Sequence, residues 1–505
     1  MARLSDKLAE SLEVLQNLQE RGYIAIRSKD LTRTHRERLV QNGFLQSVMK
    51  GWYIPTRPDE TTGESTAWYA SFWDFCASYL TVRFGKKWCL SPEQSLLIHV
   101  GNRNVPPQLL VRASKAQNTV TELLYGTSIL DVQSALPLAT DTINRDNLNI
   151  LTLPSALIAC SPNFYRQNPT EVRAALAMIR DASEILDRLL EGGHSSVAGR
   201  LTGAFCNIGR TRIADDIVRT MQAAGYSVRE TDPFEAESPL VFTSSDRSPF
   251  VNRIRLMWQE MRVPIIKQFP PAPGLVKDKK AYLKQVEDTF VMDAYHSLSI
   301  EGYRVSQELI ENVRKGKWNP DANQADRNQR DALAARGYWQ AFQAVKKSLQ
   351  NILKGHNPGS VADEDHGTWY REMFAPSVAA GLLRPADLAG YRNGQVYIRR
   401  SMHVPPNHEA VRDLMPVLFD LLKEESDPGV RVVLGHFVLV FIHPYIDGNG
   451  RIGRFLMNAM FAAGGWPWTI IPVEKRDLYM KALESASTLQ EIKPFTKFLA
   501  GFVKR

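Results

Sequence analysis

The 505-residue sequence has few cysteines and no apolar run long enough to cross a bilayer. The longest apolar candidate, Val432 to Ile442, falls short of the roughly 20 residues that a spanning helix needs. The N-terminus reads as a charged amphipathic helix without the apolar region of a signal peptide. We therefore expect a cytoplasmic protein with no membrane partner. No CxxC spacing is present, so neither a zinc site nor a disulfide framework is predicted, and we expect free thiols at Cys76, Cys89, Cys160 and Cys206.

The length and composition are those of a soluble protein with several domains. A prior of about 150 residues per domain suggests about two to four domains. Hydrophobic residues make up 44% of the chain and charged residues 23%, as in ordinary globular proteins. The net charge of +8 is compatible with nucleic acid or nucleotide partners, but its spread over 505 residues distinguishes neither.

Residues 1–58 predict a winged helix-turn-helix. We expect a first helix in "SDKLAESLEVLQNLQERG", a short second helix in "IRSKDL", a basic third helix in "TRTHRERLVQNG" and a hairpin in "FLQSVMKGWYIP". This order resembles the N-terminal modules of AbiEi-type antitoxin and regulator proteins. DNA would then bind through residues 28–52, with Arg33, Arg36, Arg38 and Lys50 facing it. The alternative is a module that contacts only proteins, with these arginines on a solvated face.

The rest of the chain changes character twice. Residues 64–235 predict a mixed α/β interaction module, with a helix in "STAWYASFWDFCASYL" and strands in "LSPEQSLLIHVGNRNVPPQLLVRAS". Residues 236–279 contain frequent prolines and predict a linker or strap around one helix. Residues 280–505 are helical except for "GYRNGQVYIRRSMHVPPN", whose alternation predicts a β-hairpin. The predicted fold class is mainly α.

The segment "HPYIDGNGRIGR", residues 443–454, concentrates the chemistry. Pro444 ends an apolar helix near His443, and the glycines suit a tight turn into a second helix that starts near Arg451. Free amide groups and the positive end of the helix dipole make this turn an anion site. Arg451 and Arg454 add forks for phosphate oxygens, and Asp447 suits a hydrated Mg²⁺. His443 is placed to take a proton from an incoming hydroxyl.

This segment resembles the signature of Fic domains at every defined position, with Tyr445 where phenylalanine is commonest. The resemblance covers roughly 280–505 and implies an all-helical Fic domain with a β-hairpin flap, "VYIRRSMHVPP". It implies a protein adenylyltransferase, which moves AMP from ATP to a serine, threonine or tyrosine hydroxyl of a protein, including the enzyme itself. Pairing of two copies is a further expectation from the resemblance.

The resemblance also assigns roles. His443 would deprotonate the target hydroxyl, Asp447 would coordinate Mg²⁺, and Arg454 would grip the γ-phosphate. Tyr479 would lie near the base, although Ser487 stands where some members present asparagine to the adenine. The remaining nucleotide contacts would come from Gly448, Asn449, Gly450, Arg451, Ile452 and Gly453. The flap backbone at Val396, Tyr397, Ile398 and Arg399 would line the nucleotide and pair with the target as an added strand.

A second motif, "YHSLSIEGYR", lies upstream at the end of an expected helix over about 281–302. Ser297 and Glu301 share one helix face, and Gly302 suits the helix terminus. The spacing resembles the inhibitory motif of Fic proteins, in which Glu301 would pair with Arg454 and occupy the γ-phosphate site. The alternative is an ordinary helix end with a solvent-facing glutamate.

Two hypotheses of different classes follow. The first is an auto-inhibited adenylyltransferase, with removal of AMP from modified targets as a further activity. The second is a nucleotide-sensing transcriptional regulator or antitoxin-like DNA-binding protein. The complete set of catalytic residue types favours the first hypothesis, and the predicted winged helix with the net charge of +8 favours the second.

Overall fold

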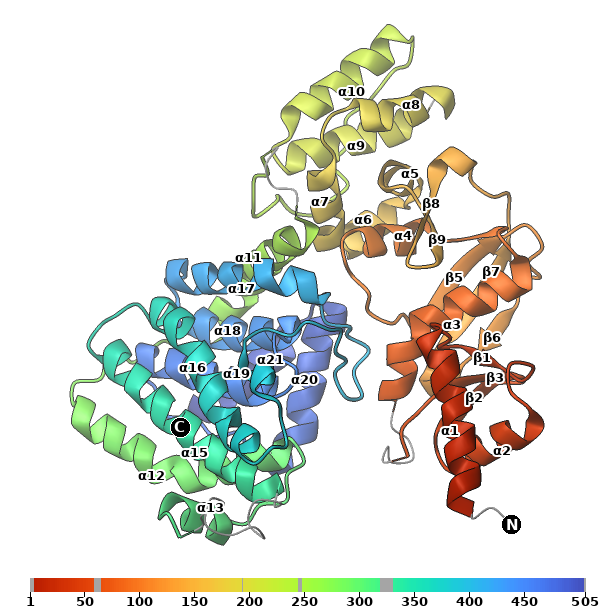
Figure 1. The fold of residues 1–505 in the computed structure, drawn as a ribbon. Helices are drawn as coiled ribbons and strands as arrows, with labels where there is room; N and C mark the ends of the chain where they lie inside the picture. The colour runs from red at the N-terminus through yellow and green to blue at the C-terminus, as the bar shows by residue number, and fades with distance from the viewer. Residues whose placement is uncertain (1–3, 59–64, 193, 244–247, 318–329, 504–505) are drawn as a thin grey trace. The chain divides into compact units, whose positions relative to one another are not determined.

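The computed structural model describes residues 4–58, 65–192, 194–243, 248–317 and 330–503 (Figure 1). The chain divides into two compact units. The first unit comprises Met1–Arg253 together with Tyr397–Val404, and the second comprises Ile254–Val396 together with Pro405–Arg505. The division at residue 253 falls inside helix α11, Pro249–Gln268. The mainly α fold class is confirmed, with a mixed α/β N-terminal part.

The first unit begins with two helices and a three-stranded antiparallel sheet. Its elements are α1 (Leu4–Glu20), β1 (Ile26–Arg27), α2 (Arg33–Gln41), β2 (Leu45–Met49) and β3 (Trp52–Pro55). The strands lie in the order β1-β3-β2, and the predicted hairpin is β2–β3. Gly51 permits its turn because its φ is +82°.

The short helix predicted in "IRSKDL" is wrong. Residues 28–31 form a turn, and Ile26 and Arg27 pair with Tyr53 and Trp52 of the sheet. The backbone N–H of Arg27 donates to Asp30 Oδ2 at 2.9 Å, while the N–H of Asp30 donates to the Arg27 carbonyl at 2.9 Å. These local bonds close a turn where a four-residue helix would have left its end groups unpaired.

The remainder of the first unit is a small mixed sheet followed by helices. Strand β5 pairs in parallel with β7, while β4 and β6 flank this pair in antiparallel fashion. The elements are α3 (Thr66–Phe84), β4 (Trp88–Leu90), α4 (Pro92–His99), β5 (Gln108–Ala113), β6 (Val120–Glu122), η1 (Leu124–Gly126), β7 (Ser128–Gln133), η2 (Ala139–Asp141), β8 (Thr142–Arg145), β9 (Leu148–Leu151), α5 (Leu153–Ala159), α6 (Pro162–Gln167), α7 (Pro169–Met178), α8 (Ser183–Gly192), α9 (Ser195–Asn207) and α10 (Thr211–Ala223).

Two expectations for this region have different outcomes. The stretch expected to form strands contains β5, but its first half is helix α4. Ser91 caps this helix by accepting a hydrogen bond from the N–H of Gln94 at 3.2 Å, and Pro92 occupies its first turn. The prediction of free cysteines is confirmed for all four, of which Cys76, Cys89 and Cys160 are buried.

The second unit is helical. Its elements after α11 are α12 (Lys279–Ile300), α13 (Gln307–Arg314), α15 (Arg330–Leu353), α16 (Pro358–Ala379), η3 (Pro385–Leu388), α17 (His408–Glu424), α18 (Pro428–Ile442), α19 (Asn449–Gly464), η4 (Val473–Lys475), α20 (Arg476–Leu489) and α21 (Lys493–Val503). Helices α18 and α19 are buried along most of their lengths. None of the helices in the described part of the chain has the length and apolar character that a bilayer crossing requires.

The prediction of a β-hairpin in residues 390–407 is wrong. The segment is a loop without strand pairing, and it turns at Arg400, whose φ is +58°. Its backbone groups make isolated bonds in place of a ladder. For example, the Ser401 N–H donates to the Ile398 carbonyl at 3.1 Å, and the Arg400 N–H donates to Thr66 Oγ1 at 3.3 Å. Because residues 397–404 belong to the first unit, the alternation reports burial there and not a strand of the second unit.

Candidate active site

The turn between α18 and α19 is held by its own polar groups. His443 caps α18 in the left-handed region with φ of 53°, and its N–H donates to the Leu439 carbonyl at 2.9 Å. The Asn449 side chain binds both backbone groups of Tyr445. Its Oδ1 accepts from the Tyr445 N–H at 2.8 Å, and its Nδ2 donates to the Tyr445 carbonyl at 2.9 Å. Gly448 has a φ of +82°, and a Cβ there would meet the Phe374 ring at 2.8 Å. Any residue other than glycine at position 448 would therefore be strained in the backbone conformation of this turn.

His443 is placed as a neutral imidazole. Its Nδ1 lies 3.1 Å from the Val440 carbonyl oxygen, which can only accept, so Nδ1 carries the hydrogen and Nε2 keeps its lone pair. Burial, together with a smaller contribution from the Arg392 charge, lowers the pKa of His443 to about 4. The ring can thus accept a proton at neutral pH.

Arg451 is almost fully buried, with 1% of its side chain exposed, yet its partners are few. Its Nη2 donates to Asp447 Oδ2 at 3.1 Å, and its guanidinium lies over the rings of Tyr303 and Phe374 at 5.2 and 5.1 Å. Its Nε has no hydrogen-bond partner among the described residues. Such a buried, unsatisfied cationic donor is costly unless a ligand completes it.

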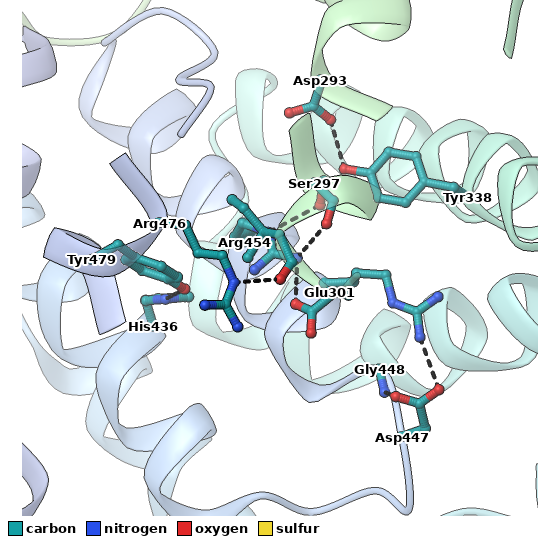
Figure 2. A network of polar contacts seen from close by, with 12 residues as sticks. Asp293, Ser297, Glu301, Tyr338, His436, Asp447, Gly448, Arg454, Arg476 and Tyr479 are labelled. Carbon is teal, nitrogen blue, oxygen red and sulfur yellow. Dashed lines mark hydrogen bonds and ion pairs between the residues drawn. The ribbon is translucent and has the colours of Figure 1, made fainter. Parts of the chain in front are cut away.

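Arg454 is hydrogen-bonded to residues at the end of α12, as Figure 2 shows. Its Nε donates to Ser297 Oγ at 2.9 Å, and its Nη2 donates to Glu301 Oε1 at 2.7 Å and to the Ser297 carbonyl at 3.1 Å. Burial alone would lower the pKa of Arg454, but the Glu301 carboxylate outweighs it and the pKa is raised. Its Nη1 finds no partner in the described part of the chain. The expected ion pair is therefore present, with one donor of the arginine unsatisfied.

Glu301 also lies against the first turn of α19. A Cβ added to Gly450 would come within 2.3 Å of Glu301 Oε1, so the absence of a side chain there admits the carboxylate. Glu301 is the C-cap of α12, and Gly302 follows with a φ of +88°. The carboxylate thus sits at the positive end of the α19 dipole, where an anionic ligand would bind.

Helix α12 is fixed in this position by a second polar pair (Figure 2). The Tyr338 hydroxyl of α15 donates to Asp293 Oδ2 at 2.7 Å, one turn before Ser297. Burial raises the pKa of Asp293 to about 6. On the other side, Arg476 Nε of α20 donates to the Ile300 carbonyl at 2.9 Å and so holds the helix terminus.

Tyr479 is buried beside this network. Its hydroxyl lies 2.7 Å from His436 Nε2, and the two rings are stacked with centroids 5.8 Å apart (Figure 2). Burial raises the pKa of Tyr479 to about 12 and lowers that of His436 to about 4, so both are neutral at pH 7. His436 was not predicted from the sequence. Only its place about two helical turns before His443, in an otherwise apolar helix, marks it.

Arg392 is a second residue that the sequence analysis missed. It is fully buried, and its Nε donates to the His443 carbonyl at 2.8 Å while its Nη1 donates to the Gly394 carbonyl at 2.8 Å. Its Nη2 also donates to the Pro406 carbonyl. Arg392 therefore joins both ends of the loop that contains residues 397–404 to the backbone of His443. A single arginine in a polar stretch offers no pattern that would reveal this.

The other predicted residues take varied places. Ile452 is buried inside the second unit, and a Cβ at Gly453 would meet His436 Nδ1 at 2.9 Å, so both pack α19 against its neighbours. Val396 belongs to the second unit, whereas Tyr397, Ile398 and Arg399 belong to the first. The roles assigned to these four flap residues stay predictions.

Asp447 has the chemistry for a magnesium contact but is alone. Its Oδ1 accepts from the Gly448 N–H at 2.6 Å, and 58% of its side chain is exposed. Among the described residues there is no group of three or more His, Cys, Asp or Glu side chains that could hold a metal ion. A single exposed carboxylate fits a Mg²⁺ that keeps several waters and is shared with phosphates.

Comparison with known proteins finds a family match for the region that contains this turn. Residues 364–461 match the Fic/DOC family, and this segment contains the turn from His443 to Arg454. Protein adenylyltransferase fic-1 of Caenorhabditis elegans is 29% identical over 225 residues, which cover 44% of this chain and 41% of that protein. Protein adenylyltransferase Fic of Nematostella vectensis is 29% identical over 245 residues, 47% of this chain and 52% of that protein.

The chain thus spans about half the length, or less, of the curated relatives it matches. The solved structure of Fic-1 (aa134–508) from C. elegans aligns with a TM-score of 0.37 and 20% identity, over 66% of this chain and 84% of that one. The segment 364–461 is a Fic domain.

Proposed function

From the Fic domain at residues 364–461, we propose that this protein transfers AMP from ATP to a hydroxyl group of a protein. One observation carries the proposal. Two buried arginines at the start of α19, Arg451 and Arg454, each keep a nitrogen that has no partner among the described residues, beside the neutral His443. Buried cationic donors need an anion, and the triphosphate of ATP supplies one next to a base. The names of the curated relatives agree with this activity.

The reaction follows from the state of His443. Its Nε2 takes the proton of the target hydroxyl as the oxygen attacks the α-phosphorus. A new bond forms between that oxygen and phosphorus, and the bond from the α-phosphorus to the bridging oxygen breaks. Pyrophosphate leaves with the electron pair. The hydrogen bond from Nδ1 to the Val440 carbonyl keeps the ring oriented throughout.

The phosphates would be held by the first turn of α19. The backbone N–H groups at the start of α19, from Asn449 to Arg451, and the guanidinium of Arg451 would line the anion site, and Arg454 would take the γ-phosphate. Asp447 would hold Mg²⁺, which neutralises phosphate charge when bound. Tyr479, fixed by His436, would lie near the adenine, and residues 396–399 would receive the target as an added strand.

The resting protein would be inhibited by Glu301. Its carboxylate occupies the Arg454 donor that a γ-phosphate requires, and it stands against Gly450 at the helix dipole. Adding ATP would therefore place two anions at one cationic site. Breaking a buried pair costs about 3–5 kcal/mol, so the shift in phosphate binding is large enough to control activity. The exposed 27% of the Glu301 side chain reduces this figure by solvent screening.

The test compares Glu301→Gly with His443→Ala in the full-length protein. Incubation with Mg²⁺ and ATP labelled at the α-phosphate should label protein several-fold faster in Glu301→Gly than in the wild type. His443→Ala, added to Glu301→Gly, should lower labelling by about 10²–10⁴-fold. The matched control is Glu308→Gly, which changes an exposed glutamate of α13.

Equal labelling by the wild type and Glu301→Gly would remove the inhibition from the proposal. Labelling that survives His443→Ala would remove the mechanism. Mass spectrometry of the labelled protein identifies the transferred group and the modified residue type. Release of AMP from modified protein tests the reverse activity.

The alternative is a nucleotide-sensing regulator that binds DNA through residues 28–52. Exposed Lys50 on the β2–β3 turn favours it, because wings of this kind contact phosphates. A gel shift with the protein's own upstream DNA separates this function from AMP transfer. Measurement of molar mass in solution tests the expected homodimer.

A further inference from the structure

The first unit contains a cavity of about 390 Å³. All of its lining residues lie between Arg112 and His194, so the cavity is formed entirely within Met1–Arg253. Its volume falls in the range of about 300–1,000 Å³ that is usual for small-molecule sites. A small organic molecule would therefore fit in a part of the chain that does not contain the catalytic turn.

The cavity lies at the end of the small mixed sheet. Strands β5 and β7 run parallel to each other. Arg112 is the last residue but one of β5, and the lining residues 135–137 come just after the end of β7. Helices α5 and α8 supply further lining residues. Ligands of open α/β sheets bind beyond the carboxyl ends of the parallel strands, so the position of this cavity suits a ligand.

Most of the charged groups in the lining are already paired with one another. Arg188 of α8 binds two carboxylates, since its Nε lies 2.5 Å from Asp141 Oδ1 and its Nη1 lies 3.0 Å from Glu191 Oε2. The Ser155 hydroxyl of α5 also donates to Asp141 Oδ1, at 2.8 Å. The charge of Arg188 is therefore satisfied within the protein, and a ligand would have to displace a carboxylate to reach it.

Arg112 has a different environment. It is half-buried, and its side chain makes no hydrogen bond or ion pair with any residue that the structure describes. Its charge lies near the thiols of Cys89 and Cys160, but burial raises the pKa of both thiols, to about 12 for Cys89, against the opposing effect of Arg112. Both thiols are therefore neutral at pH 7 and supply no counter-charge. An anionic ligand would complete this guanidinium.

The rest of the lining determines what kind of anion fits. Its larger apolar residues are Leu136, Pro137, Leu151 and Ile158. The planar fork of one guanidinium matches one carboxylate. The carboxylates of Asp141 and Glu191 line the same cavity and would repel a second negative charge, such as that of a phosphate dianion. His194, the remaining ionisable residue of the lining, is exposed. The lining therefore favours one carboxylate on an apolar body.

We propose that the first unit binds a small monocarboxylate with a compact apolar body in this cavity, and that Arg112 holds the carboxylate. The apolar residues after β7 and on α5 would enclose the body of the ligand. The proposal is independent of the proposed AMP transfer, because every lining residue belongs to the first unit.

The test is isothermal titration of the full-length protein with benzoate, which has one carboxylate on an apolar ring. We expect saturable binding in the wild type. Arg112→Met should weaken it about ten-fold or more, because a hydrogen bond to a charged group is lost. Arg112→Lys keeps the charge without the planar fork and should weaken it less. The matched control is Arg166→Met, which changes an exposed arginine of α6 and should leave the affinity unchanged.

Two further measurements use the wild type alone. Benzamide has the shape of benzoate without its charge, and inorganic phosphate has charge without an apolar body. Each should bind at least about ten-fold more weakly than benzoate. Amide hydrogen exchange then locates the site, because saturating benzoate should slow exchange in residues 133–136 and in α8.

Several results would overturn the proposal. They are the absence of saturable benzoate binding in the wild type, equal or tighter binding of benzamide or phosphate, and unchanged affinity in Arg112→Met with an intact melting curve. Protection confined to α19 would also overturn it, since benzoate would then occupy the site of the buried arginines. If Arg112→Met does not fold, the contrast between benzoate and benzamide and the exchange map of the wild type decide the proposal.

Discussion

Helices α2 and α19 each carry two arginines three residues apart, and the structure uses them in opposite ways. In α2, Arg33 has 82% of its side chain exposed and pairs with Glu37 at 2.6 Å, while Arg36 donates to the Ser28 carbonyl at 3.0 Å. In α19, Arg451 and Arg454 are buried and each keeps a nitrogen without a partner in the described part of the chain.

The difference separates an arginine that supports the fold from one that awaits a ligand. Arg38, the third arginine of α2, donates to Ser11 Oγ at 2.8 Å and so ties this helix to α1. The Arg38 guanidinium lies near the surface, where water can accept a hydrogen bond from any donor that the protein leaves unpaired. In α19 the side chains of Arg451 and Arg454 are only 1% and 5% exposed, so an unpaired donor there raises the free energy of the resting protein until an anion binds.

The largest expected effect comes from removing the buried charge. In the Glu301→Gly background, Arg454→Met should lower the rate of AMP transfer about 10–150-fold, since a hydrogen bond to a charged group contributes about 1.5–3 kcal/mol. The rate of protein labelling at a fixed ATP concentration measures this.

Arg33→Met in the same background is the matched control and should change the rate by less than about two-fold. An equal loss of AMP-transfer rate in Arg454→Met and Arg33→Met would mean that the burial of an arginine does not determine whether it takes part in the reaction. A melting curve for each variant shows whether the fold is intact.

The second expected effect concerns His443, the half-buried base at the end of α18. Burial lowers the pKa of His443 to about 4, so the base stays deprotonated as the pH falls and protonates only below that value. In Glu301→Gly, kcat/KM for ATP should therefore hold constant from pH 7 to about pH 5, where an ordinary histidine with a pKa near 6.5 would lose more than about ten-fold.

In the pH profile, the acidic fall of kcat should lie at higher pH than the acidic fall of kcat/KM, because bound phosphates stabilise the imidazolium of His443. The depressed pKa also means that folding stability falls as the pH drops below about 6.5, so rates are compared only where the protein remains folded. A kcat/KM limb near pH 6.5 would contradict the buried, neutral state of His443.

The smallest expected effect lies in α2. Arg38→Ala should lower the free energy of unfolding of the first unit by about 1 kcal/mol, since it removes the bonds to Ser11 and to the Lys7 carbonyl. Arg33→Ala should stay within about 0.5 kcal/mol, because its pair with Glu37 is exposed. Denaturant titration measures the free energy of unfolding of both variants. A larger destabilisation by Arg33→Ala than by Arg38→Ala would contradict the assignment of Arg38 as the arginine that supports the fold.

Local patterns were sufficient where the residue types allow one backbone conformation. The end of α18 at His443, the glycine turn and the end of α12 before Gly302 were predicted because proline and glycine restrict the backbone directly. The contact between Glu301 and Arg454 was expected from the resemblance of the motif at 297–302 to the inhibitory motif of Fic proteins, and the ion pair is present.

Local patterns were insufficient where distant segments supply the partners. Residues 28–31 were expected to be helical, but the Ser28 N–H donates to the carbonyl of Gly51 and the Asp30 N–H donates to that of Arg27. The segment 390–407 was expected to be a hairpin, but its Met402 and Val404 pack against the hydrophobic core of the first unit. Arg392 and His436 escaped detection because burial, which no short pattern reports, decides what they bind.

The sequence by itself therefore determined the chemical parts of this protein: a glycine turn between two apolar helices, a histidine before it, and arginines and a glutamate at helical spacing. Only the tertiary structure decided which arginine keeps a spare donor, that Glu301 rests against Gly450, and that residues 397–404 belong to the first unit. The physical reason is that residue type and spacing act within a few residues of chain. Burial and the pairing of charges depend instead on segments that approach from elsewhere in the fold.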